Sequence, residues 1–128
     1  MLHNLLIIEK FTGISIGNIN LSGKDYTEKE IDFLSASIKA IQGFFKEMDF
    51  GELETFQFLE KTIMIHTKNS IVMLLICDKD TSNLPQYYPK LELISVMFEK
   101  SIEWFSWDGN VSKFQKLLDA AKEILLDS

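Results

Sequence analysis

Residues Ser70 to Asp78 read SIVMLLICD, and the seven residues from Ile71 to Cys77 are all apolar. A helix needs a longer segment, whereas a short apolar run with polar residues at both ends is typical of a strand that is buried on both faces. We therefore predict that this segment is the middle strand of one sheet. Weaker strands are expected beside it, and amphipathic helices are expected over its two faces.

The length and composition predict one folded domain over residues 1–128. The chain has 128 residues, 46% of them hydrophobic, which is enough to bury a core without crosslinks. Its single cysteine, Cys77, excludes an internal disulfide and favours a cytoplasmic location. Its apolar runs are far shorter than the about 20 residues that span a bilayer, and its start, MLHNLLIIEK, does not resemble a signal peptide. We expect no transmembrane segment, and peripheral membrane association only through partners.

The charged residues argue against a nucleic-acid partner. The chain has 13 basic and 19 acidic residues, a net charge of −6, and every basic residue is lysine. Bidentate binding of phosphate or guanine is typically the work of arginine. We therefore expect no binding to DNA or RNA.

Two strands are predicted at the start of the chain. Leu2 to Lys10 and Ile14 to Leu21 are apolar enough to form a hairpin. The alternation of the second segment places Ile14 and Ile16 on one face but Ile19 and Leu21 on the other, with Gly17-Asn18 between them. This phase change predicts a bulge or a close backbone approach, on a strand at the edge of the sheet.

A long helix is predicted to begin at Thr27, because TEKE matches a capping box between Thr27 and Glu30. An apolar stripe at helical spacing should face the sheet: Ile31, Leu34, Ile38, Ile41, Phe45 and Met48. A polar line should face water: Asp32, Ser35, Lys39, Gln42 and Lys46. A second line flanks the stripe: Phe33, Ser37, Ala40 and Phe44. Either the helix is sunk deeply into the protein, or this line docks a second copy or a partner, with two small residues between aromatic anchors.

Three antiparallel strands and two helices complete the prediction. The acidic segment from Asp49 to Glu54 reads as a solvated loop. Thr55 to Leu59 and Thr62 to Thr67 alternate as strands and lead into the organising strand. Helical spacing then continues from Leu91 to Trp107, and a last helix follows Asp108-Gly109-Asn110.

No catalytic, cofactor-binding or metal site is predicted. The two histidines, His3 and His66, have no partner that the sequence specifies, and Cys77 lies in the core strand, where a thiol is inert. Asp78-Lys79-Asp80 reads as a turn that ends a strand, because no nucleotide-binding glycine loop accompanies it. Trp104 and Trp107 are expected to seal the junction between the last two helices.

The predicted order of strand, strand, helix, three strands, helix and helix resembles the longin domain. The resemblance covers nearly the whole chain, and four segments carry it: LLIIEKFTGISIGNINL, the helix after TEKE, FQFLEKTIMIHTKNSIVMLLICDK and WDGNVSKFQ. It implies an α+β sandwich, of longin/profilin-like type, in which a five-stranded antiparallel sheet has one helix on one face and two on the other. Roadblock (dynein light chain) domains and profilins share this architecture but open with a helix. Because the sequence starts with a strand, we expect the longin order.

The resemblance also implies a function without catalysis. Longin and roadblock domains dimerise and hold or regulate small Ras-like GTPases in vesicle trafficking and signalling. This chain is accordingly expected to be a dimeric adaptor or regulator, as a homodimer or with a related domain, and without a cofactor. The expected interface combines the flanking helix line with the edge strand: Phe33, Ser37, Ala40, Phe44, Ile14 and Ile16.

Two other functions stay open. A small-molecule sensor of the PAS or GAF type would also place helices against an antiparallel sheet, and it predicts an enclosed, polar-lined cavity between sheet and helix. An enzyme would require a cleft with perturbed ionisable groups, which the sequence does not assemble.

Overall fold

A computed structural model of the chain describes residues 2–10, 15–23, 26–48, 55–57, 60–81, 84–101 and 114–126, without the side chains of residues 45, 56 and 101. Its elements follow the order strand, strand, helix, three strands, 3-10 turn, helix and helix. Their bounds are β1 Leu2–Glu9, β2 Ser15–Asn20, α1 Glu28–Glu47, β3 Thr55–Gln57, β4 Lys61–Lys68, β5 Ile71–Asp78, η1 Leu84–Gln86, α2 Tyr87–Ser101 and α3 Gln115–Leu126.

The sheet has five strands in the order β2-β1-β5-β4-β3, and all its pairings are antiparallel. β5 lies in the middle, paired with β1 on one side and β4 on the other. All seven residues from Ile71 to Cys77 are buried, as the apolar run predicts. The α+β class, with an antiparallel sheet and three α-helices, is confirmed.

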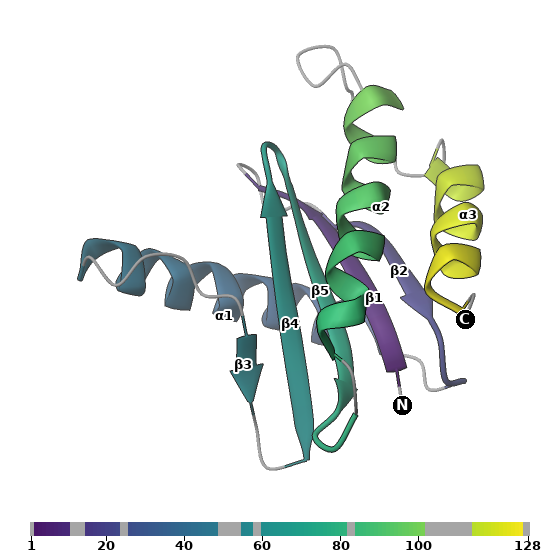
Figure 1. The fold of residues 1–128 in the computed structure, drawn as a ribbon. Helices are drawn as coiled ribbons and strands as arrows, with labels where there is room; N and C mark the ends of the chain where they lie inside the picture. The colour runs from purple at the N-terminus through teal and green to yellow at the C-terminus, as the bar shows by residue number, and fades with distance from the viewer. Residues whose placement is uncertain are drawn as a thin grey trace.

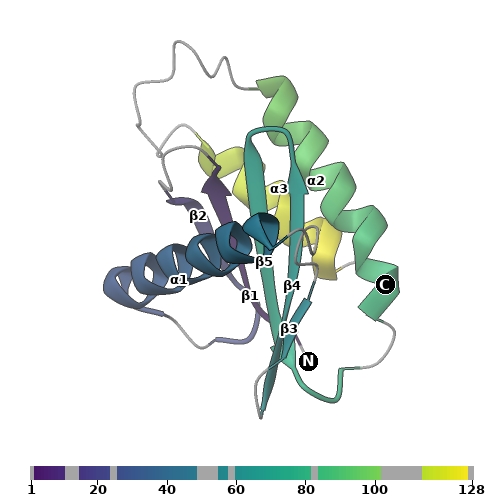
Figure 2. The same ribbon diagram turned by 90° about the vertical axis from the view of Figure 1, so that its left-hand side faces the viewer.

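Helices cover both faces of the sheet (Figures 1 and 2). α2 and α3 lie side by side on one face, while α1 runs across the strands on the other. Alternate residues of β5 enter the two cores: Met73 and Leu75 pack toward α2 and α3, whereas Leu74 and Ile76 pack with Ile38 of α1. Because both faces of β5 are covered, the strand needs no polar face.

β2 is an edge strand with a bulge, as predicted, but the faces assigned to its residues are wrong. Ile7 pairs with Gly17 and Ile8 with Ser15, so Ile16 is the extra residue of the bulge. The extra residue shifts the alternation, and Ile16 and Ile19 therefore enter the same core. The predicted close approach is also present, because Leu118 of α3 packs directly against Gly17.

α1 begins as the sequence predicts. The Glu30 amide donates to the Thr27 hydroxyl over 3.1 Å, and the Thr27 amide donates to the Glu30 carboxylate over 3.0 Å, so the capping box is confirmed. Two assignments along the helix are wrong. Ser35, expected on the wet face, is buried and donates its hydroxyl to the Ile31 carbonyl, while Met48, expected on the sheet, is 52% exposed.

Several predicted features lie outside the described residues. These are Ile14, the acidic segment 49–54, and Trp104 and Trp107 with the junction they were expected to seal. Within the described helices, none is both long and apolar enough to cross a membrane.

Candidate functional site

One flank of α1 presents large apolar side chains to solvent. Phe33 is 76% exposed and Phe44 is 58% exposed, and both lie on the line that also carries exposed Met48. Between the two aromatic residues are the small Ser37 and Ala40. We call Phe33, Ser37, Ala40, Phe44 and Met48 the aromatic flank.

Ser37 and Ala40 leave room for close approach on the aromatic flank. The Ser37 hydroxyl donates to the Phe33 carbonyl over 2.8 Å, so the polar group is satisfied within the helix. Ala40 is exposed and adds only a methyl group. A helix laid along this flank can therefore come close between two aromatic anchors.

A groove of about 430 Å³ continues the aromatic flank onto the sheet. Phe33 and Leu34 of α1, Tyr26, and the sheet residues Ile63 and Ile76 supply its apolar lining. We call it the aromatic groove. It lies between α1 and the strands β4 and β5, which supply Ile63 and Ile76.

A second groove, of about 300 Å³, lies on the other flank of α1. Its apolar floor comes from Ile8, Ile38 and Val72, and three lysines line it: Lys10, Lys39 and Lys46. We call it the lysine groove. The aromatic flank and the residues of α1 in this groove lie on roughly opposite sides of the helix, at about 100° per residue.

One of the predicted interface residues is buried, and another lies outside the described residues. Ile16 is 1% exposed and packs in the core beneath α2 and α3, because the bulge turns it inward, so its side chain cannot act as a surface contact. Ile14 lies outside the described residues. Phe33, Ser37, Ala40 and Phe44 lie on one flank of α1. β2, which carries Ile16, is an edge strand of the sheet and does not belong to that helix flank.

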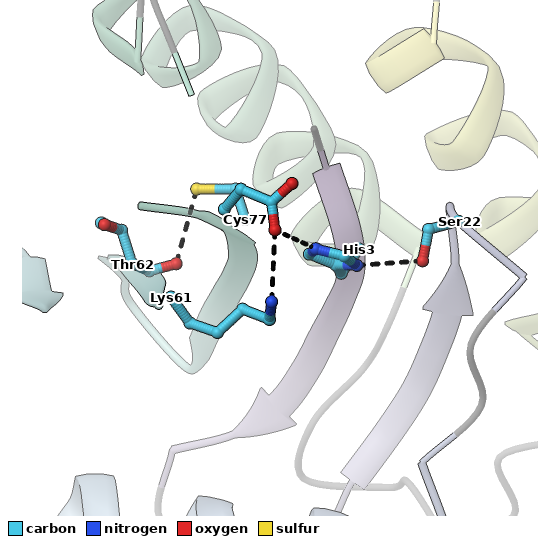
Figure 3. Close-up of polar contacts among 6 residues, drawn as sticks. His3, Ser22, Lys61, Thr62 and Cys77 are labelled. Carbon is cyan, nitrogen blue, oxygen red and sulfur yellow. Dashed lines mark hydrogen bonds and ion pairs between the residues drawn. The ribbon is translucent and has the colours of Figure 1, made fainter. Parts of the chain in front are cut away.

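A polar cluster closes one end of the sheet (Figure 3). His3 Nε2 lies 2.6 Å from Asp78 Oδ1, and His3 Nδ1 lies 3.1 Å from Ser22 Oγ. Lys61 Nζ donates to the same Asp78 oxygen over 3.2 Å. The hydrogen bonds from His3 and then Lys61 lower the pKa of Asp78 to about 2.

Ser22, His3 and Asp78 are the residue types of a nucleophilic triad, and their contacts join separate segments of the fold. The three residues come from β1, β5 and the turn after β2, and Asp78 also binds Lys61 of β4, so the cluster as a whole ties four segments. Neither groove beside α1 is lined by His3 or Ser22. The lowered pKa of Asp78 means that these hydrogen bonds contribute to the stability of the sheet end.

A second ionic cluster fixes α2 to the sheet. His66 Nε2 lies 3.0 Å from Glu92 Oε2, and Lys68 binds the other oxygen of the same carboxylate. The hydrogen bond from Lys68 is the main cause that lowers the pKa of Glu92. The Ser70 amide donates to Glu99 over 2.9 Å, which ties the β4–β5 turn to the same helix.

Cys77 and the acidic residues offer little chemistry in the described parts of the chain. The Cys77 thiol is buried, donates to the Thr62 carbonyl over 3.4 Å, and has a pKa raised by that burial (Figure 3). No group of three metal-binding side chains gathers among the residues that the structure places.

Sequence reasoning missed the lysine groove and both histidine clusters. The seven-residue spacing of Lys39 and Lys46 is a signal that they share a helix flank. Lys10 joins them only through the fold, and the same holds for His3 and Asp78, which are 75 residues apart.

No family model matches the sequence, and no curated protein sequence matches it. The structure is similar to that of MglB from Myxococcus xanthus, with a TM-score of 0.50 and 13% sequence identity, over 97% of this chain and 80% of MglB. At that identity the similarity concerns the fold. The chain folds as a longin/roadblock-type domain, as the resemblance in its sequence implied.

Proposed function

We propose that this protein is a non-enzymatic interaction module, a dimeric adaptor or regulator of small Ras-like GTPases in membrane trafficking or signalling. The longin/roadblock-type fold supports the class of function, because domains of this type dimerise and associate with such GTPases. The proposal includes one domain over residues 1–128, a cytoplasmic location, and membrane association only through partners. The dimer is either homotypic or formed with a related domain.

The observation that carries the proposal is the exposed aromatic flank of α1. Phe33 and Phe44 of α1 and its C-cap residue Met48 lie along one line, and each is more than half exposed. Aromatic residues in such a patch are typical anchors of protein interfaces. The adjoining aromatic groove extends the apolar surface onto the sheet and gives a partner side chain a place to insert. The margin of β2 is a second proposed contact, through its backbone.

The first experiment substitutes the two aromatic anchors. The double variant Phe33→Asp, Phe44→Asp should raise the dimer dissociation constant by about two orders of magnitude in analytical ultracentrifugation, since each anchor contributes about 1–2 kcal/mol. Its circular dichroism should not change, because both side chains are exposed. Leu93→Asp, at an exposed position of α2, is the matched control and should leave the dimer intact. An unchanged dimer in the double variant would remove the aromatic flank from the proposal.

The second experiment tests the GTPase assignment. The wild-type protein is used to recover partners from native cell extract with a non-hydrolysable GTP analogue or with GDP, and the partners are identified by mass spectrometry. Recovery of a Ras-like GTPase that differs between the two nucleotides is expected. Recovery of no such GTPase with either nucleotide contradicts the assignment.

The structure supports the small-molecule sensor function less well than the adaptor function. The sensor function predicts an enclosed, polar-lined cavity between sheet and helix, whereas the two spaces beside α1 are grooves with apolar floors and exposed residues at their rims. The adaptor is therefore the function that the geometry supports better.

A further inference from the structure

We propose that the lysine groove binds the anionic head and apolar tail of a linear acyl-chain carboxylate. This inference goes beyond the interaction function, because it concerns the other flank of α1 and a small-molecule ligand.

The charges around the groove select an anion. Lys10 follows β1, while Lys39 and Lys46 belong to α1, so the positive charges reach the groove from two elements. None of the lining residues that the structure describes is acidic, although the chain carries 19 acidic residues and a net charge of −6. Thr67 and Gln42 add half-buried polar groups that can hydrogen-bond a carboxylate. A local excess of lysine in an acidic protein is complementary to a negatively charged head group.

The floor of the groove selects an apolar tail. Ile8 and Val72 from the sheet and Ile38 from α1 supply its apolar surface. A fully polar anion such as phosphate would make no apolar contact with this floor, whereas an acyl chain would cover it. The ligand is therefore expected to be amphipathic.

The size of the groove selects a small, linear molecule. The lining residues of α1 run from Ser35 to Lys46, about 16 Å along the helix axis at 1.5 Å per residue. The volume of about 300 Å³ lies at the lower end of small-molecule sites. A peptide helix, about 10 Å across with its side chains, does not fit that space. A single acyl chain lying along α1 does.

Gly43 gives independent support for an occupant. It lies inside α1, where glycine is less favourable than alanine, and it lines the groove. A Cβ atom placed there would meet nothing within 4 Å, so no neighbour in the described structure requires the absence of a side chain. A ligand that approaches the helix backbone at Gly43 would require the absence of a side chain there.

The experiment measures binding of laurate, below its micelle concentration, by calorimetry and by amide chemical shifts. Laurate should bind saturably, one per protomer, and shift amides of α1 and of β1. Dodecyltrimethylammonium, with the same chain length and the opposite charge, should bind at least about tenfold more weakly. Equal binding of both amphiphiles would overturn the proposal, because the lysines would then play no part.

Two pairs of variants locate the site. Gly43→Leu fills the groove and should weaken laurate binding at least about tenfold, and Gly43→Ala, which adds only a Cβ atom, should weaken it to a smaller extent. Lys10→Glu, Lys46→Glu should also weaken binding about tenfold, while Lys100→Glu, Lys122→Glu makes the same change of net charge on α2 and α3 and should not. The lysine variants decide the question if Gly43→Leu does not fold. Laurate binding that survives in every folded groove variant overturns the proposal.

The dimer variant keeps this test separate from the proposed function. Phe33→Asp, Phe44→Asp alters the opposite flank of α1 and should bind laurate as the wild type does. Binding that is lost together with the dimer would place the ligand at the aromatic flank and would contradict the assignment to the lysine groove.

Discussion

At the level of single residues, Asp78 connects more of the chain than its place at the end of β5 indicates. Its carboxylate accepts hydrogen bonds from His3 and Lys61, and His3 in turn contacts Ser22. The sequence predicted only that Asp78 ends a strand, which is correct. Its partners could not be predicted, because they belong to β1 and β4 and depend on the sheet order.

Asp78→Asn should lower the stability of the protein in a pH-dependent way. The pKa of Asp78 is about 2 in the folded protein against 3.8 for the free side chain, so its ion pairs stabilise the fold fully above about pH 4. This contribution is lost as the pH falls toward 2. We expect a melting temperature a few degrees below that of the wild type at pH 7, and a difference that shrinks between pH 4 and pH 2. Asp80→Asn, two residues further in the turn after β5, is the control for a change of charge alone.

A melting temperature of Asp78→Asn that equals the wild-type value at pH 7 would show that the ion pairs add nothing to the fold. A difference between the two proteins that grows as the pH falls would contradict the direction of the pKa shift.

At the level of elements, periodicity predicted which side of α1 meets the sheet but not what lies beside it. Ile31 and Ile38 pack on the sheet as the stripe requires. Ser35 is buried and Met48 is exposed, which is the opposite of the prediction. The angle at which α1 crosses the strands decides which flank of the helix the sheet covers, and at which residue the helix extends beyond the sheet. That angle is a property of the packed elements, and the helix sequence alone does not contain it.

The contact between β2 and α3 is the element-level feature that a substitution can test. A Cβ atom at Gly17 would overlap Leu118 Cδ2 and would lie 2.9 Å from Leu118 Cδ1, so a larger side chain must displace Leu118. Gly17→Val should cost about 1–3 kcal/mol of unfolding free energy, as overpacking does. Leu118→Ala should relieve part of that cost in the double variant, by about 0.5–3 kcal/mol relative to additivity. Denaturant unfolding of the two single variants and the double variant measures the coupling.

Strict additivity in this cycle would mean that the two residues do not share the contact. The sequence predicted that a glycine at the phase change permits either a bulge or a close approach, and the structure contains both. The identity of the approaching residue could not be predicted, because α3 is almost 100 residues away along the chain.

At the level of the whole molecule, the apolar run from Ile71 to Cys77 was sufficient to predict the layered fold. A strand without a polar face must be central and covered twice, and the remaining elements then have few places to lie. The grooves beside α1 were not predictable in this way. They arise because one helix covers a face of the same sheet that two helices cover on the other side.

Native-state hydrogen exchange should show that the central strand β5 is more stable than the edge strand β3. Amides of β5 from Val72 to Ile76 lie in a strand that is paired on both sides and buried on both faces, so they should exchange only through global unfolding, typically about 5–15 kcal/mol. Amides of β3, a three-residue strand at the margin, should exchange through local opening at much lower free energy. Exchange is measured at increasing denaturant concentrations. The free energy of exchange of the β5 amides should equal the free energy of global unfolding at every denaturant concentration. If β5 instead opened at the low free energy of β3, the central position of the Ile71 to Cys77 run would not organise the stability of the domain.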